Sequence, residues 1–387
     1  MSVCALIAEY NPFHNGHLRQ INYIKNTLKA DKIVVIMSGA FTQRGEPAVL
    51  DKHTRASHAI KAGADLVIEL PTVFATANAE IFALGAVKTI SQIPAIDTIC
   101  FGVESGDTEN YFSLAKAMLN ESKEFKKILK AELDNGVSLA RAKFNAIKAL
   151  NLTTADETLI SSPNNILALE YVKAIIKFGL DINVCPLQRD NIHNDKTIKG
   201  KITSASSIRN ALTIGKKRKI KKCVPKFVYK DLTIPTDFDK VILSALIVTP
   251  AEQMQEILDC TEGLENRIKA LVKDNNDYPS LLKKVVTKRY TESRIKRILL
   301  ANLLGITADF VFKCLKSDLY LKVIAMKKGC NVLSSASKNA PVLTRKADYK
   351  NLDKTASKCA EIDLIATELY NMVTGNPQNE YYTLIME

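Results

Sequence analysis

At 387 residues the chain is longer than one ordinary domain, so two or three domains are expected. Hydrophobic residues make up 47% and charged residues 25%, a composition that predicts a folded core and excludes an intrinsically disordered chain. No apolar run reaches the length of a transmembrane helix, and no basic stretch precedes the apolar N-terminal segment. We therefore expect a cytoplasmic protein that does not bind a membrane.

The net charge of +13 is unevenly divided between the two halves of the chain. Residues 1–200 contain 22 Lys and Arg against 21 Asp and Glu, whereas residues 201–387 contain 32 against 20. Basic surface attracts polyanions through counterion release. The asymmetry therefore favours a nucleic-acid partner for the second half, although a solvated, lysine-rich helical surface is the alternative.

The eight cysteines are scattered, without a C-x-x-C pair and without partnered histidines. This spacing argues against both a zinc site and a disulfide framework. Several of the cysteines lie in apolar runs, where a small buried thiol is the usual case. We therefore expect no metal ligated by the protein.

Short apolar or β-branched segments alternate with helical patterns in the first half. Strands are expected at residues 3–8, 32–37, 66–70, 98–101 and 184–187. Helices are expected between them, at residues 17–29, 54–62, 78–92, 109–150 and 164–178. This rhythm predicts a Rossmann-like α/β fold, in which helices cover a parallel sheet. Ligands of such sheets bind at the carboxyl ends of the strands, so the turns after the first, second and fourth strands should face one crevice.

After about residue 212 the pattern becomes mainly helical. Amphipathic helical segments dominate residues 237–304, and helical character continues around residues 309–326 and 360–372. A linker is expected near the basic run at residues 216–222. We therefore expect an α/β domain over residues 1–212 and a mainly helical, basic region over residues 213–387.

The turn after the first strand holds the signature H-x-G-H, formed by His14, Asn15, Gly16 and His17. A strand–turn–helix of this kind directs backbone N–H groups and the positive helix end at whatever binds above the turn, which favours a phosphate. Gly16 allows the backbone to approach that phosphate closely, and the two histidines can donate hydrogen bonds to its oxygens. The sequence therefore predicts a nucleotide-phosphate site here.

A second motif, Ser204 to Arg209 (SASSIR), begins a helix with several hydroxyls that can cap it. Ser206 and Ser207 lie in its first turn, and Arg209 adds a forked, permanently charged donor. Alone, the segment would be an ordinary serine-capped helix. Together with the upstream H-x-G-H turn, it is expected to form the other half of a triphosphate clamp.

These two motifs resemble those of the H-x-G-H nucleotidyltransferase superfamily, which has a HUP-type α/β fold. A closer resemblance, to the bacterial tRNA(Met) cytidine acetate ligases, is carried by further segments that run in order over roughly residues 1–300. Besides the SASSIR element, these segments are AEYNPFHNGHL (8–18), MSG (37–39), QRGEPA (43–48), DLVIELP (65–71), FG (101–102) with Glu104 and Gly106-Asp107, PNNIL (163–167), EGLENR (262–267) and TKRY (287–290). The chain after about residue 305 resembles the family least.

The resemblance implies a specific reaction. Such enzymes activate acetate with ATP to acetyl-adenylate and release pyrophosphate. They then transfer the acetyl group to N4 of the wobble cytidine of elongator tRNA(Met), which gives N4-acetylcytidine. ATP would be a substrate, and Mg²⁺ is expected with the nucleotide.

The resemblance also implies site residues in this chain. His14, His17 and Arg209 are expected to be catalytic. From its place in the glycine-flanked loop after the second strand, Arg44 is a candidate for holding acetate or for closing the site, with a surface arginine as the alternative. The ATP site is expected to comprise Ile7, Ala8, Glu9, Tyr10, Asn11, Pro12, Phe13, His14, Asn15, Gly16, His17, Leu18, Arg19, Gln20, Gly102, Asn164, Arg189, Ser206 and Ser207.

Two basic segments are candidates for tRNA contact. A basic segment with an aromatic residue suits backbone contact and base stacking on RNA. The tRNA-binding candidates are Lys217, Arg218, Lys288, Arg289, Tyr290, Arg294 and Arg297. Either segment could instead be a solvated helix face, and the first could be only a linker.

Three other functions compete with the acetate ligase. A small-molecule adenylyltransferase of cofactor biosynthesis is the main alternative, but such enzymes are compact and need no basic helical extension. An enzyme that acetylates a protein-bound thiol, as citrate lyase ligases do, would not need a surface for RNA. An RNA-binding protein with an inactive nucleotide fold is disfavoured, because His14, His17 and Arg209 are all present.

Overall fold

The computed structural model describes residues 1–137, 139–152, 157–189, 197–198, 200–275, 277–287, 289–336 and 340–387. Within them, one mixed sheet has the strand order β5-β4-β1-β2-β3-β6-β7, and β8 pairs with β6. The strands are β1 (Val3–Ala8), β2 (Lys32–Ser38), β3 (Leu66–Leu70), β4 (Thr98–Val103), β5 (Asn183–Gln188), β6 (Leu321–Lys327), β7 (Val342–Leu343) and β8 (Leu384–Met386). The five strands expected in the first half are confirmed, and all five are parallel.

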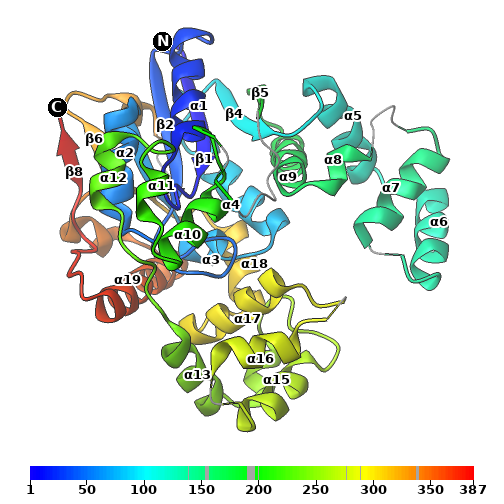
Figure 1. Cartoon of the computed structure of the whole chain (residues 1–387). Helices are drawn as coiled ribbons and strands as arrows, with labels where there is room; N and C mark the ends of the chain where they lie inside the picture. Colours follow the sequence, from blue (N-terminus) through cyan, green and yellow to red (C-terminus); the bar gives the residue numbers. More distant parts are fainter. Residues whose placement is uncertain are drawn as a thin grey trace.

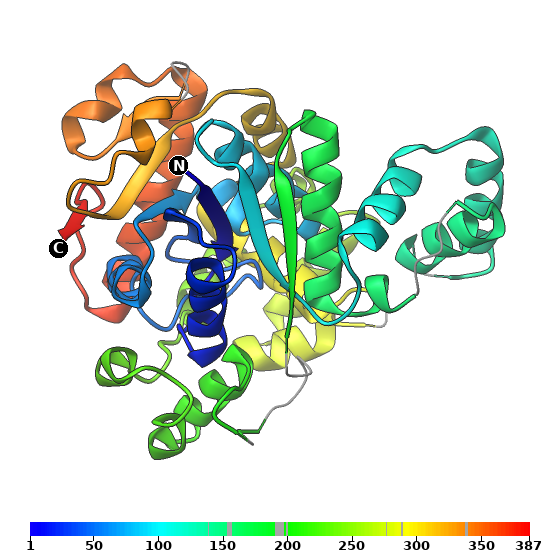
Figure 2. The same ribbon diagram turned by 90° about the horizontal axis from the view of Figure 1, so that it is seen from above.

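Helices cover both faces of this sheet (Figure 2). Along β1, Val3 and Ala5 belong to the core on one face, whereas Cys4 and Leu6 belong to the core on the other. Parallel strands buried on both faces carry continuous apolar runs, which is why the sequence identified them. One face packs against α4 (Ala79–Ser91), α5 (Thr108–Leu119) and α9 (Pro163–Phe178), and the other against α1 (Asn15–Asn26), α2 (Lys52–Ala62), α10 (Ala205–Thr213), α11 (Lys217–Ile220) and α12 (Lys226–Asp231).

Two groups of helices extend beyond the sheet (Figure 1). One group pairs α6 (Lys123–Asp134) with α7 (Leu139–Ala149), next to α8 (Thr158–Ser161). The other group comprises α13 (Asp239–Val248), α14 (Ala251–Gln255), α15 (Leu264–Lys273), α16 (Tyr278–Val285) and α17 (Glu292–Leu304). No single helix of the described residues is long and apolar enough to cross a membrane; α17 and the following α18 (Ala308–Lys316) pass that test only as a pair, bent by 84°.

The helical expectation for residues 309–326 is correct over α18 and wrong over β6. The segment LKVIAMK is a short apolar run, which periodicity alone cannot distinguish from a buried helix. In the structure it pairs antiparallel with β3 and is buried over most of its length. The sheet therefore contains strands from both sides of the boundary expected near residue 212.

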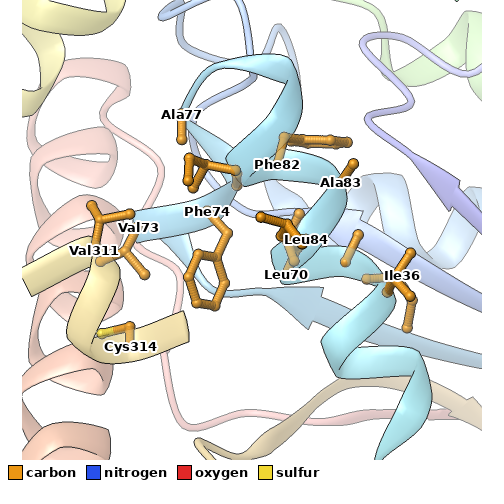
Figure 3. Packing of buried hydrophobic residues seen from close by; sticks show 14 of the residues in the cluster. Ile36, Leu70, Val73, Phe74, Ala77, Phe82, Ala83, Leu84, Val311 and Cys314 are labelled. Carbon is orange, nitrogen blue, oxygen red and sulfur yellow. The ribbon is translucent and has the colours of Figure 1, made fainter. Parts of the chain in front are cut away.

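Helix α18 and the C-terminal α19 (Lys354–Thr374) share the core of the sheet. Figure 3 shows Val311 and Cys314 of α18 beside Val73 of the short helix α3 (Thr72–Ala75). The ring of Phe74 fills the space next to Gly85 of α4, where an added Cβ would lie 2.3 Å from the Phe74 Cγ atom. This packing fixes the C-terminal helices to the N-terminal half.

Four buried charges link β6 and the C-terminal tail to the first half of the chain. The Nζ atoms of Lys52 and Lys322 lie 2.9 and 2.8 Å from the Glu69 carboxylate, and both lysines also contact Glu380. Burial alone would raise the pKa of Glu69, but the two lysines lower it to about 2. Two positive and two negative charges balance, so removal of one leaves a buried charge without compensation.

We expect Glu380→Gln to lower the free energy of unfolding by about 3–5 kcal/mol, because Lys52 and Lys322 would share one carboxylate. Urea unfolding measures this loss. Glu368→Gln, on the exposed side of α19, is the matched control, and it should change the free energy of unfolding by no more than about 0.5 kcal/mol. Equal stabilities of the two variants would contradict this account.

Since folding lowers the pKa of Glu69 from 4.5 to about 2, its contribution to the free energy of unfolding is present above pH 4.5 and is lost as the pH falls toward 2.

Candidate nucleotide-binding site

A cavity of about 230 Å³ opens at the carboxyl ends of β1, β4 and β5, between the first turn of α1, the start of α9 and the start of α10. Its position is the one expected for a ligand of a parallel sheet. The predicted ATP-site residues that line it are Ile7, Ala8, Glu9, Tyr10, Asn11, His14, Gly16, His17, Arg19, Gln20, Gly102, Asn164 and Arg189. Arg44 lines it as well. The predicted residues outside the described lining are Pro12, Phe13, Asn15, Leu18, Ser206, Ser207 and Arg209.

The two histidines of the H-x-G-H turn cap the start of α1 reciprocally. The Gly16 N–H donates to His14 Nδ1 at 3.0 Å, and the His14 N–H donates to His17 Nδ1 at 3.2 Å. Because each Nδ1 accepts a backbone hydrogen bond, a neutral ring carries its proton on Nε2. Both rings therefore present Nε2–H donors, as a phosphate site requires.

Ring packing explains why glycine separates the two histidines. The His14 and His17 rings stack with centroids 3.7 Å apart and planes inclined by 21°, and the Tyr10 ring meets His17 edge-on at 4.9 Å. A Cβ at Gly16 would lie 2.8 Å from His14 Cε1. Gly16 is thus needed by the histidine stack itself, in addition to the close backbone approach expected from the sequence.

The SASSIR motif contacts the loop that carries the H-x-G-H turn through Arg209. Its Nη1 donates to the Asn11 carbonyl at 2.8 Å, and burial lowers its pKa. Ser204 is the N-cap of α10, and its Oγ accepts the Ser207 N–H at 3.1 Å. Ser204, the first residue of the predicted motif but not one of the predicted ATP-site residues, lines the cavity. The structure thus brings the two predicted motifs together.

A third cluster lies at the ends of β4 and β5. Arg189 Nη1 donates to Asn164 Oδ1 at 3.3 Å, and Asn164 Nδ2 donates in turn to Glu104. A Cβ at Gly102 would lie 3.2 Å from Arg189 Cδ, so glycine leaves room for that side chain. Gly102, Asn164 and Arg189, predicted separately, therefore form one wall of the cavity.

Sequence reasoning missed Arg55, which is completely buried. Its guanidinium donates to the backbone carbonyls of Glu9 at 2.7 Å and Ser38 at 2.9 Å, and also to that of Gly39. Arg55 thus fixes the chain where β1 and β2 end. In the sequence Arg55 is only an arginine within an expected helix, and such a residue usually lies on the solvent-exposed face.

The loop after β2 carries Gln43 and Arg44 into the cavity wall. The Gln43 N–H donates to Glu9 Oε1 at 2.8 Å. Behind the loop, Gly45 (φ 71°) lies so close to α17 that an added Cβ would be 2.5 Å from the Arg297 backbone nitrogen. Lys296 Nζ pairs with Glu46 at 2.6 Å. The basic helix α17 therefore supports an edge of the cavity.

Three of the predicted RNA-contact residues in and before α17, Arg289, Tyr290 and Arg294, make contacts within the chain. Arg289 pairs with Glu262, which also accepts from the Tyr290 hydroxyl at 3.2 Å. Arg294 donates twice to the Asp259 carbonyl, at 3.0 and 2.6 Å. The backbone nitrogen of Arg297 lies against Gly45, and its Nε atom is buried without a hydrogen-bond partner among the described residues. Lys288 lies outside the described residues. The Arg289 side chain is exposed in spite of its ion pair, so RNA contact by this segment stays a prediction.

The other basic segment is more available to a partner. Residues 201–230 contain ten Lys and Arg and no Asp or Glu. Lys217 is partly engaged, since it donates to the Leu232 carbonyl, but Arg218 and its neighbours Lys216, Lys219, Lys221 and Lys222 are exposed. Asn15 holds this segment beside the H-x-G-H turn by donating to the carbonyls of Lys201 and Lys222 at 2.8 and 2.9 Å.

Comparison with known proteins agrees with this geometry. The family described as HIGH Nucleotidyl Transferase matches residues 1–383. Curated relatives named tRNA(Met) cytidine acetate ligase are 36% identical in Acetivibrio thermocellus and 37% identical in Thermoanaerobacter sp., each over 97% of this chain and 96% of the relative. Crystal structures of Thermotoga maritima TmcAL superpose over 100% of both chains, with a TM-score of 0.92 (apo, 29% identity) and 0.90 (bound with alpha-thio ATP, 28% identity).

The parallel strands β1 to β5, the H-x-G-H turn and the helix start of α10 form the α/β arrangement of a nucleotidyltransferase. The chain belongs to the HIGH nucleotidyl transferase family and, within it, to the tRNA(Met) cytidine acetate ligases. The names of these relatives favour the acetate ligase over an adenylyltransferase of cofactor biosynthesis.

We expect His17 to be neutral, with its proton on Nε2, at pH 6.5 in the nucleotide-free protein. Burial, and then the charges of His14 and Arg189, lower its pKa well below 6.5. The unfolded chain therefore binds this proton more readily, and His17 reduces stability as the pH falls below 6.5. Side-chain ¹⁵N NMR, assigned with a His17→Gln variant, measures the tautomer. An imidazolium at pH 6.5 would contradict the capping arrangement.

We expect Gly45→Ala to lower acetate-dependent ATP–pyrophosphate exchange by about 10- to 100-fold, since the Cβ would push the Gln43–Arg44 loop away from α17. Gly305→Ala is the matched control. Gly305 also has a positive φ, of 65°, but nothing lies within 4 Å of its added Cβ. Equal losses in the two variants would show that backbone strain, and not the position of the loop, limits the reaction.

Proposed function

We propose that this chain is an ATP-dependent acetate ligase, which forms acetyl-adenylate and transfers the acetyl group to N4 of the wobble cytidine of elongator tRNA(Met). The observation that supports this most is the H-x-G-H turn, whose two Nε2–H donors stand at the carboxyl end of β1 in a cavity shared with Gly102 and Arg189. A relative of the same fold binds alpha-thio ATP.

In the first half-reaction, an acetate oxygen attacks the α-phosphorus of ATP, and the bond to the bridging oxygen of pyrophosphate breaks. Acetate is ionised at pH 7 and needs no general base. Catalysis then consists of positioning and of stabilising negative charge. His14 and His17 donate to phosphate oxygens, and Arg209, held against Asn11, contributes positive charge beside them.

Mg²⁺ is proposed to enter with the nucleotide and to neutralise phosphate charge. Among the described residues, no three His, Cys, Asp or Glu side chains lie together as a ligand set. A nucleotide-borne ion needs few protein ligands, because phosphate oxygens and water complete its octahedral shell. His14, His17 and Arg209 would hold the phosphates that carry such an ion, and the ion would supply further positive charge there.

The tRNA is proposed to bind the exposed basic surface at residues 216–222, within the region after residue 212. Asn15 of the H-x-G-H turn donates to the carbonyls of Lys201 and Lys222 and so holds this surface beside the turn. We therefore expect RNA bound there to reach the cavity. Arg218 is exposed and forms no ion pair with the described residues, whereas Arg289 and Arg294 have internal partners. Because ATP, acetate and tRNA are cytoplasmic molecules, we place the enzyme in the cytoplasm.

The test is incorporation of labelled acetate into elongator tRNA(Met) by the purified protein with ATP. We expect His17→Ala to lower the rate by about 100-fold or more, because it removes a donor to the reacting phosphate. His53→Ala is the matched control, since His53 lies on α2 and contacts Gln378 and the Tyr382 carbonyl of the C-terminal tail. Label on a tRNA whose wobble cytidine is replaced, or full activity of His17→Ala, would reject the proposal.

A further inference from the structure

Glu9 is the only acidic side chain among the described residues that line the cavity. The other charged lining residues are Arg19, Arg44 and Arg189. Since ATP and acetate are anions, a carboxylate in this wall weakens the binding of both substrates of the first half-reaction. Glu9 is therefore expected to act in a step other than the first half-reaction, one in which a negative charge favours the reaction.

The surroundings of Glu9 hold its carboxylate in one orientation. Oε1 accepts the Gln43 N–H at 2.8 Å, and the Glu9 carbonyl accepts from the buried Arg55 at 2.7 Å. No hydrogen bond from a described residue occupies Oε2. One oxygen thus anchors the side chain, and the other is available to a donor on a substrate.

The strand order places Glu9 at one end of the cavity. Gly102 and Arg189 follow β4 and β5, Glu9 follows the central β1, and Gln43 and Arg44 come after β2 on the opposite side. The proposed nucleotide would place its adenosine beside Gly102 and Arg189 and its phosphates at the histidines, so the acyl group and its acceptor would lie toward β2. Glu9 stands between the phosphates and that end.

We propose that Glu9 binds the N4 amino group of the acceptor cytidine and removes its proton during acetyl transfer. This inference rests on the proposed function. The amino group of cytosine is a hydrogen-bond donor that Glu and Asp accept from. In the step, the N4 lone pair attacks the acetyl carbonyl carbon and forms the C–N bond. The C–O bond to the AMP phosphate breaks, AMP leaves with the electron pair, and the N4 proton moves to Glu9 Oε2.

The experiment separates the two half-reactions in Glu9→Gln. Glutamine keeps an oxygen that accepts the Gln43 N–H, so the loop stays in place, but it is no base. We expect acetate-dependent ATP–pyrophosphate exchange to be retained or increased, because glutamine removes a negative charge that opposes the binding of ATP and acetate. We expect single-turnover transfer from preformed acetyl-adenylate to elongator tRNA(Met) to fall by about 100-fold or more.

Two further variants complete the comparison. Glu9→Asp retains a carboxylate and should transfer acetyl faster than Glu9→Gln, which also provides a test if the glutamine variant does not fold. Glu80→Gln, an exposed carboxylate at the start of α4, is the matched control and should leave both half-reactions unchanged.

The possible results separate a failure of the proposed function from a failure of the inference about Glu9. If the unsubstituted protein activates acetate but never labels tRNA, the proposed function fails independently of Glu9. If that protein labels tRNA and Glu9→Gln transfers equally fast, the inference is overturned. Equal loss of exchange and transfer in a folded Glu9→Gln protein would also overturn it, since Glu9 would then act on the nucleotide or its Mg²⁺.

Discussion

The site depends on one reciprocal pair of hydrogen bonds, in which backbone N–H groups donate to the Nδ1 atoms of His14 and His17. These bonds begin α1 and at the same time decide which ring nitrogen carries a proton. The same atoms therefore determine both local folding and the direction in which the donors point. Gly16 is part of this arrangement because any Cβ there would collide with the His14 ring.

The rest of the chain holds this turn and its surroundings in place. Arg55 ties the ends of β1 and β2 together through their carbonyls, and Arg209 connects the turn to α10. Farther away, α17 supports the Gln43–Arg44 loop through Gly45. The C-terminal tail completes the buried charge group at Lys52 and Glu69. Segments more than 200 residues from the H-x-G-H turn thus contribute to the geometry of one cavity.

The parallel strands and the two phosphate motifs could be predicted because their signals are local: apolar runs, a glycine between histidines, and serines at a helix start. Strand β6 could not, since a short apolar run after a helix has no distinctive periodicity. The roles of Arg55 and Asn15 depend on carbonyl partners supplied by the fold. Likewise, the internal contacts of Arg289 with Glu262 and of Arg294 with the Asp259 carbonyl could not be predicted, because these partners are close only in the folded chain.

A crystal structure with a non-reactive acetyl-adenylate analogue, acetyl sulfamoyl adenosine, tests the account most directly. We expect His14 and His17 Nε2 within about 2.7–3.2 Å of oxygens at the phosphate position, with adenine beside Gly102 and Arg189 and the acetyl group toward Glu9 and Gln43. An analogue bound in the reverse direction along the sheet, or with neither histidine in contact with it, would contradict the account.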